Sequence, residues 1–91
     1  SKSSPVSGAT LTKDEARVSV LGVPDVPGTS LAIFSAIAAR KIAVDMVVQN
    51  VGQAGKADIS FTVPGGELNA TLNALKKPAE QLGATEVTHD S

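Results

Sequence analysis

Residues 57–63 alternate strictly between apolar and polar side chains, and no other segment constrains the fold as strongly. The run reads A-D-I-S-F-T-V, with Ile59, Phe61 and Val63 on one parity and Ser60 and Thr62 on the other. Because successive side chains of a strand point to opposite faces, this alternation predicts a β-strand with one covered face. At 91 residues the chain is expected to form one domain.

Three further segments are predicted to be strands. Residues 17–23 alternate before they turn apolar, and residues 43–51 (A-V-D-M-V-V-Q-N-V) are rich in valine. The turn at 53–56 is short, so the strands on either side of it are predicted to form an antiparallel hairpin. Residues 85–88 are predicted to form a short final strand, and residues 6–11 carry a weaker strand pattern.

Two segments are predicted to be helices. The first spans about 28–41, after the break at P-D-V-P-G, with Thr29 or Ser30 near its cap and Arg40 and Lys41 complementing the dipole at its end. Its expected apolar face consists of Leu31, Ile33, Phe34, Ile37 and Ala38.

The second helix is predicted from apolar residues that recur at spacings of three and four. These residues are Leu68, Leu72, Leu75, Ala79 and Leu82. Pro78 lies inside the pattern, where it removes a backbone donor, so a kink or a pause is expected there. Gly83 is predicted to cap the C-terminus of this helix.

The element order β-α-β-β-α-β predicts an α+β, ferredoxin-like sandwich. Right-handed crossovers would place two helices on one face of a four-stranded antiparallel sheet and leave the other face open. Residues 1–16 are expected to form an N-terminal segment, and residues 17–91 the folded domain.

Composition argues against several classes of function. The chain has no Cys, so disulfides and thiolate metal sites are excluded, and no metal or other cofactor is expected. Eight Lys and Arg balance nine Asp and Glu, and two Phe are the only aromatics, which disfavours nucleic-acid binding. No apolar run approaches the length of a membrane span and no signal peptide is recognisable, so a cytoplasmic location is expected.

No set of residues predicts catalysis. His89 is the only histidine, and it lies near the C-terminus without a partner for acid–base chemistry. Asp14 and Glu15 precede the first predicted strand, where a solvated turn explains them. There is no phosphate-binding loop and no pairing of a nucleophile with a base.

Residues 21–28 (L-G-V-P-D-V-P-G) carry the most informative chemistry. They join a strand to a helix N-terminus, where free backbone donors favour an anion, and Gly28 permits close approach. Asp25 could accept hydrogen bonds from an ammonium group, so the pair of features describes a free amino acid. From spacing alone, an ordinary Pro/Gly turn with Asp25 as a local cap is the more common explanation.

Gln49 and Asn50 are a second candidate pair, near the end of the strand predicted at 43–51. Side-chain amides both donate and accept hydrogen bonds, so they suit a zwitterion or a hydroxyl. Taken alone, an edge strand with polar ends explains them better.

Together these segments resemble a known family. Residues 17–28 (R-V-S-V-L-G-V-P-D-V-P-G) resemble the first strand and loop of an ACT domain. Residues 42–51 (I-A-V-D-M-V-V-Q-N-V) and 58–64 (D-I-S-F-T-V-P) resemble, more narrowly, the first ACT domain of aspartate kinase. The resemblance runs from about residue 8 to residue 90, which is nearly the whole chain.

The resemblance implies a regulatory role. Aspartate kinase phosphorylates aspartate, and its ACT domains bind lysine or threonine at an interface between ACT domains and thereby inhibit the kinase. The implied partners are the effector, another ACT domain (a second unit or another copy of this chain) and the kinase domain. Carried over to this chain, the effector-binding residues are Asp25, Pro27, Gly28, Thr29, Ser30, Asp45, Met46, Gln49, Asn50 and Val51. Gly52 and Ser60 align with positions whose change relieves inhibition in relatives.

The chain departs from the family's full-length pattern. It contains no kinase domain and no second ACT domain, and Pro78 stands where relatives continue a helix. Two other functions remain open. A small acylphosphatase would share the fold class, but its chemistry needs an Arg in the first loop, and residues 22–29 contain none. A ligand-free dimerisation module is the other alternative.

Overall fold

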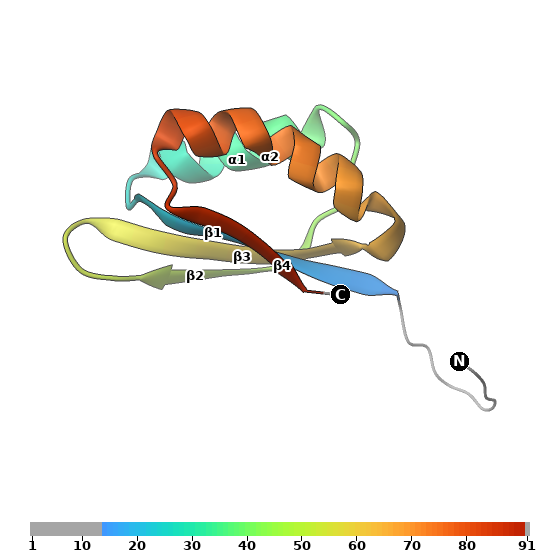
Figure 1. Ribbon diagram of the computed structural model, residues 1–91, viewed down its shortest axis with the longest axis horizontal. Coiled ribbons are helices and arrows are strands. Elements are labelled where there is room, and N and C mark those ends of the chain that lie inside the picture. The colour runs from blue at the N-terminus through green and yellow to red at the C-terminus, as the bar shows by residue number, and fades with distance from the viewer. Residues whose placement is uncertain (1–13, 91) are drawn as a thin grey trace, which may run out of the picture.

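The computed structural model describes residues 14–90 and has the predicted ferredoxin-like architecture. Strands β1 (Glu15–Pro24), β2 (Asp45–Val51), β3 (Lys56–Pro64) and β4 (Glu86–Asp90) form one antiparallel sheet in the order β2-β3-β1-β4. Helices α1 (Pro27–Ala38) and α2 (Leu68–Leu82) lie on the same face of this sheet (Figure 1). A single 3-10 turn, η1 (Gly65–Glu67), leads from β3 into α2.

The core lies between the sheet and the two helices. Along β3 every second residue is buried, as the alternation predicted, and Phe61 is fully enclosed. Phe34 of α1 meets Phe61 edge to face, with ring centroids 5.4 Å apart. The other large, fully buried apolar side chains are Val18, Val20, Val23, Ile33, Ile37, Ile59, Val63 and Leu75.

The predicted limits and apolar face of the first helix were partly wrong. The helix ends at Ala38, so Arg40 and Lys41 lie beyond it, and Lys41 has a positive φ of 59°. Ile33 and Ile37 are buried as predicted, but Leu31 is 69% exposed and Ala38 is exposed too. The residues of this helix are apolar on nearly every side, so their spacing does not determine which side faces the sheet.

The start of α1 also differs from the prediction. Val26 occupies the N-cap position, and no side chain caps the helix. Thr29 is buried instead, and its hydroxyl donates to the carbonyl of Pro24 at 2.7 Å. This bond fastens the first turn of the helix to the end of β1.

The second helix runs without interruption through Pro78, so the predicted pause is wrong. Pro78 is buried together with Leu75 and Ala79 on the inner face. Gly83 follows the helix with φ 72°, and its N–H bonds the carbonyl of Glu80, which confirms the predicted C-cap.

The strand limits shift by a few residues from the prediction. β1 begins at Glu15, which pairs with Pro64, so Glu15 lies in the sheet and not in a turn before it. β2 begins at Asp45, two residues later than 43, and β4 extends to Asp90, so His89 lies in a strand. The predicted hairpin of β2 and β3 is confirmed. The strand considered at 6–11 lies outside the described residues.

Candidate functional site

The loop between β1 and α1 is held in place from three directions. Gly22 forms part of an irregularity in β1 with φ 70°, and its N–H donates to the Asp58 carboxylate at 2.9 Å. The N–H of Asp25 donates to the carbonyl of Gly55 in the β2–β3 turn at 2.8 Å. Together with the bond from Thr29 to Pro24, these hydrogen bonds anchor the loop to both the hairpin and the helix.

The anchored loop places the start of α1 at the surface. Pro27 occupies the first turn of the helix, and a Cβ on Gly28 would meet nothing within 4 Å. The first amides of a helix lack partners within the helix, and its dipole favours an anion there. The N–H of Thr29 already bonds the carbonyl of Val26 at 3.0 Å, so the amide of Gly28 is the better candidate for an incoming carboxylate.

One hydrogen bond joins two of the residues that were assigned to the effector site. The side-chain amide of Gln49 on β2 donates to the carboxylate of Asp25 at 3.4 Å. Val51 pairs with Ala57 and Gln49 with Ile59, so both lie on the face of β2 that is directed toward the helices. Asp25, Gln49 and Val51 therefore flank the start of α1 on its β2 side.

The other predicted residues of β2 do not join this group. Asn50 pairs with Asp58 on the open face of the sheet, where it borders a pocket that also includes Arg17, Ser60 and Thr62. Ser60 shares a hydrogen bond of 2.8 Å with Ser19 on that face. The side chain of Asn50 thus points away from Asp25.

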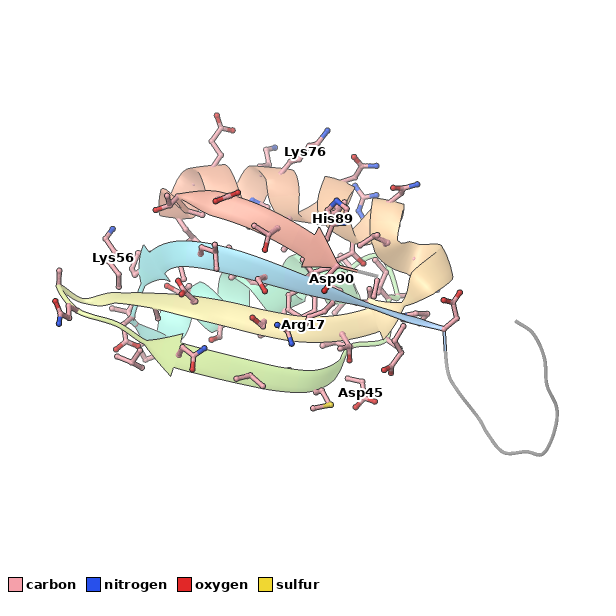
Figure 2. All side chains as sticks on the ribbon, turned by 60° about the horizontal axis from the view of Figure 1, so that its bottom comes forward. Arg17, Asp45, Lys56, Lys76, His89 and Asp90 are labelled. Carbon is pink, nitrogen blue, oxygen red and sulfur yellow. The ribbon has the colours of Figure 1, made fainter. Side chains whose placement is uncertain are left out.

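Asp45 and Met46 are also remote from Asp25, because they begin β2 whereas Gln49 and Val51 end it. Figure 2 shows Asp45 at one end of the sheet and Lys56, which pairs with Pro24 beside the Asp25 loop, at the other. Met46 has φ 47° and follows Asp45 into an irregular stretch before Val48. Within one copy of the chain, the predicted residues therefore do not form one cluster. Gln49 and Val51 lie beside Asp25, whereas Met46 and Asn50 border the same pocket on the open face of the sheet. Asp45 lies at the end of β2 that is remote from Asp25.

Sequence reasoning missed the apolar surface around this site. Every residue of β2 is exposed, although the strand contains four apolar side chains. Val26 and Leu31, at the start of α1, are also exposed. The only signal was the lack of alternation in D-M-V-V-Q-N-V, which fits an edge strand without a covered face.

Within residues 14–90, no group of three or more acidic or histidine side chains is arranged to hold a metal ion. No helix in that range is long and apolar enough to cross a membrane.

Comparison with known sequences identifies the family to which this fold and the loop before α1 belong. The sequence model of the ACT domain family matches residues 18–78, which is most of the chain. The chain belongs to the ACT domain family.

Within that family it is similar to the ACT domains of aspartate kinases. An aspartate kinase of Pseudomonas fluorescens is 40% identical over 86 residues, which cover 94% of this chain and 21% of the relative. The regulatory subunit of aspartate kinase from Thermus thermophilus, in its ligand-free form, superimposes with a TM-score of 0.80 at 33% identity, over 87% of this chain and 52% of that one. A structure of aspartokinase alpha and beta subunits superimposes with a TM-score of 0.79 at 41% identity, over 94% of this chain and 55% of that one. The chain thus spans about one fifth of the length of the curated relative.

Proposed function

We propose that this chain is the first ACT domain of an aspartate kinase, binds lysine or threonine, and transmits feedback inhibition to the kinase domain. It performs no catalysis of its own and uses no cofactor. A cytoplasmic location remains a prediction. The similarity to aspartate kinases supports the parent enzyme, and the geometry at the start of α1 supports the amino-acid site.

The observation that carries the proposal is the contact between Gln49 and Asp25 beside an uncapped helix start. A free amino acid has a carboxylate and an ammonium group only a few ångströms apart. Its carboxylate would accept a hydrogen bond from the amide of Gly28 at the helix start, and its ammonium would donate to Asp25. Gln49, which can both donate and accept, would complete the polar contacts.

The site on one copy is open, and we propose that a second ACT domain closes it. Val26, Leu31 and Val51 are each more than half exposed and surround the polar group. Apolar side chains at this density favour burial against a partner, and that burial would exclude water from the charged hydrogen bonds. Asp45 and Met46 belong to the proposed effector surface as contacts with the partner domain.

Regulation would follow from this shared site. An effector that binds only the paired arrangement stabilises that arrangement, and the kinase domain attached to it responds. Such couplings are typically about 1–3 kcal/mol, or 5–150-fold in affinity.

Ligand-free pairing is the second candidate function, and the same exposed strand favours it. Thermal melting followed by circular dichroism distinguishes the two, with lysine, threonine, both together, and glycine as the control. An effector at about 100 times its dissociation constant stabilises the fold by roughly 2.7 kcal/mol, which is a shift of several degrees for a domain of this size. We expect such a shift with lysine or threonine and none with glycine. If the isolated chain and a longer regulatory chain both melt unchanged, ligand-free pairing is the better description.

Asp25→Ala tests the site itself. The substitution removes the only carboxylate beside the start of α1 that contacts Gln49, so the effector's ammonium loses its partner. We expect effector affinity, measured by calorimetry, to fall by about tenfold or more, because a hydrogen bond to a charged group contributes roughly 1.5–3 kcal/mol. Unchanged affinity would remove Asp25 from the site.

A further inference from the structure

A pocket of about 480 Å³ lies at the end of the sheet that is remote from Asp25. It is bounded by the start of β1, the loop before β2 and the end of β3. Its lining consists of Asp14, Glu15, Ala43, Val44, Asp45, Thr62, Val63 and Pro64. Neither Asp25 nor any residue of α1 contributes to it, so it is separate from the start of α1, where the amino acid is proposed to bind, and shares only Asp45 with the proposed effector surface.

The pocket exists because the two ladders of β3 differ in length. On one side β3 pairs with β1 as far as Pro64, and the N–H of Gly65 extends the ladder to the carbonyl of Asp14 at 2.7 Å. On the other side the pairing with β2 stops at Asp45 and Thr62. Ala43 and Val44 diverge from β3 there, and the last residues of β3 have no neighbouring strand on that side among the described residues.

The polar side chains of the pocket offer hydrogen-bond acceptors. Backbone groups of successive strand residues point to alternate sides, so Pro64 points toward the vacant side when Gly65 points toward β1. Proline has no N–H, so only its carbonyl is offered. The hydroxyl of Thr62 already donates to the carbonyl of Asp45 at 2.7 Å. Three exposed carboxylates stand at the rim, on Asp14, Glu15 and Asp45, and no Lys, Arg or His lines the pocket.

The walls between these acceptors are aliphatic. Val63 is fully buried beneath the pocket, Val44 is half-buried, and Ala43 and Pro64 complete the surface. An aliphatic stem that ends in a cationic group with several N–H donors fits such a surface. Arginine and lysine side chains have this form, with the stem against apolar atoms and the charge at carboxylates.

We propose that this pocket docks an extended, basic segment of a partner polypeptide, with an Arg or Lys side chain among the three carboxylates. A polypeptide suits the pocket better than a free cation because the carbonyl of Pro64, on the vacant side of β3, can accept a hydrogen bond from a backbone N–H beside it. The interaction uses the end of β2 that is remote from Asp25, and it shares only Asp45 with the proposed effector surface, so the variants that test it leave Asp45 unchanged.

The test uses the 91-residue chain and a capped, dye-labelled pentapeptide, Val-Arg-Val-Arg-Val, whose binding is followed by fluorescence anisotropy. We expect the double variant D14N/E15Q to bind the peptide at least about tenfold more weakly than the parent chain, because it loses two charge-assisted contacts. The matched control is E80Q/E86Q, which removes two exposed carboxylates from α2 and β4 and should bind like the parent. The single variant E15Q, which leaves the Asp14–Gly65 junction unchanged, should lie between the two.

Three results would overturn the proposal. One is the absence of peptide binding by the parent chain. Another is an equal loss of peptide affinity in the two double variants, which would mean that the net charge of the chain, and not the pocket, determines binding. The third is equally tight binding of N-acetylarginine amide, which would indicate a small-cation site without a polypeptide. The thermal melts with lysine and threonine are repeated on D14N/E15Q. If this variant keeps the effector-dependent shift in melting temperature but no longer binds the peptide, the proposed regulatory function is unaffected by the loss of peptide docking.

Discussion

Gly22 is a position where a single methyl group should disrupt the fold. Its φ of 70° lies in the left-handed region, and a Cβ there would lie 2.2 Å from Oγ1 of Thr85. Gly22→Ala combines backbone strain of about 1–3 kcal/mol with a steric clash of similar cost. We expect urea unfolding to show a loss of at least about 2 kcal/mol in the free energy of unfolding.

Gly28→Ala is the matched control for that prediction. Gly28 is helical, and a Cβ on it meets no atom within 4 Å. Alanine in a helix is more favourable than glycine by about 0.5–1 kcal/mol, so this variant should be as stable as the parent or slightly more stable. Equal stabilities for the two variants would contradict the structure at Gly22.

Asp58 holds the same irregular stretch of β1 from the neighbouring strand. Its carboxylate accepts the N–H of Gly22 in a partly buried setting. Asp58→Ala leaves that donor unpaired and should lower the free energy of unfolding by about 1–3 kcal/mol. Asp58→Asn keeps an oxygen acceptor and should retain most of the stability. Chemical denaturation of both variants checks the difference, and an equal loss would mean that the hydrogen bond to Gly22 is unimportant.

At the scale of elements, the irregular start of β2 stores strain. Met46 adopts φ 47°, which costs a non-glycine residue about 1 kcal/mol or more. Met46→Gly removes this cost at an exposed position and should leave stability unchanged or raise it by up to about 1 kcal/mol. Val48→Gly, two residues later in the same exposed strand, should destabilise, since glycine weakens a strand that has no such strain. Thermal melts of the two variants that shift in the same direction would contradict this account.

Helix α2 contains the other element-scale departure from local preference. Pro78 cannot donate to the backbone of the preceding turn, and proline inside a helix costs about 3 kcal/mol relative to alanine. Pro78→Ala restores the donor but loses some buried apolar volume and the stiffness of the unfolded chain. We expect a net gain of about 1 kcal/mol in denaturant unfolding. A net loss would mean that the packing of the ring outweighs the backbone penalty.

These elements also show where sequence patterns are sufficient and where they are not. Residues 57–63 and 68–82 were predicted to within a residue, because one period dominates each segment. The face of α1 was partly mistaken, because its sequence is apolar all round and only the sheet decides which side is buried. The arrangement of the candidate site could not be predicted from the sequence either. The contact between Gln49 and Asp25 joins residues 24 positions apart and depends on the strand register. The distance of Asp45 from both residues depends on the same register.

At the scale of the whole molecule, the sheet formed by residues 14–90 has β2 and β4 at its edges, and β2 carries exposed apolar side chains. β2 lies at one edge of the strand order, and Val51 of β2 and Leu31 of α1 are 65% and 69% exposed. In Figure 1 both helices cover the same face, so neither shields the outer edge of β2. Unpaired, apolar edges promote association with another chain. The chain should therefore pair through β2 and the start of α1.

The introduction of a charge in this region tests the pairing. Leu31→Asp or Val51→Asp would place an unpaired carboxylate in the dimer interface, where it loses its hydration, so we expect the dimerisation constant in sedimentation equilibrium to weaken at least about tenfold. Asn73→Asp adds the same charge to the exposed side of α2, away from β2, and should have no effect. If lysine or threonine binds only the paired form, the effector strengthens dimerisation of the parent chain, because binding and association are reciprocally linked. A parent chain that stays monomeric with and without effector, while it still shows an effector-dependent melting shift, would place the complete site within one copy.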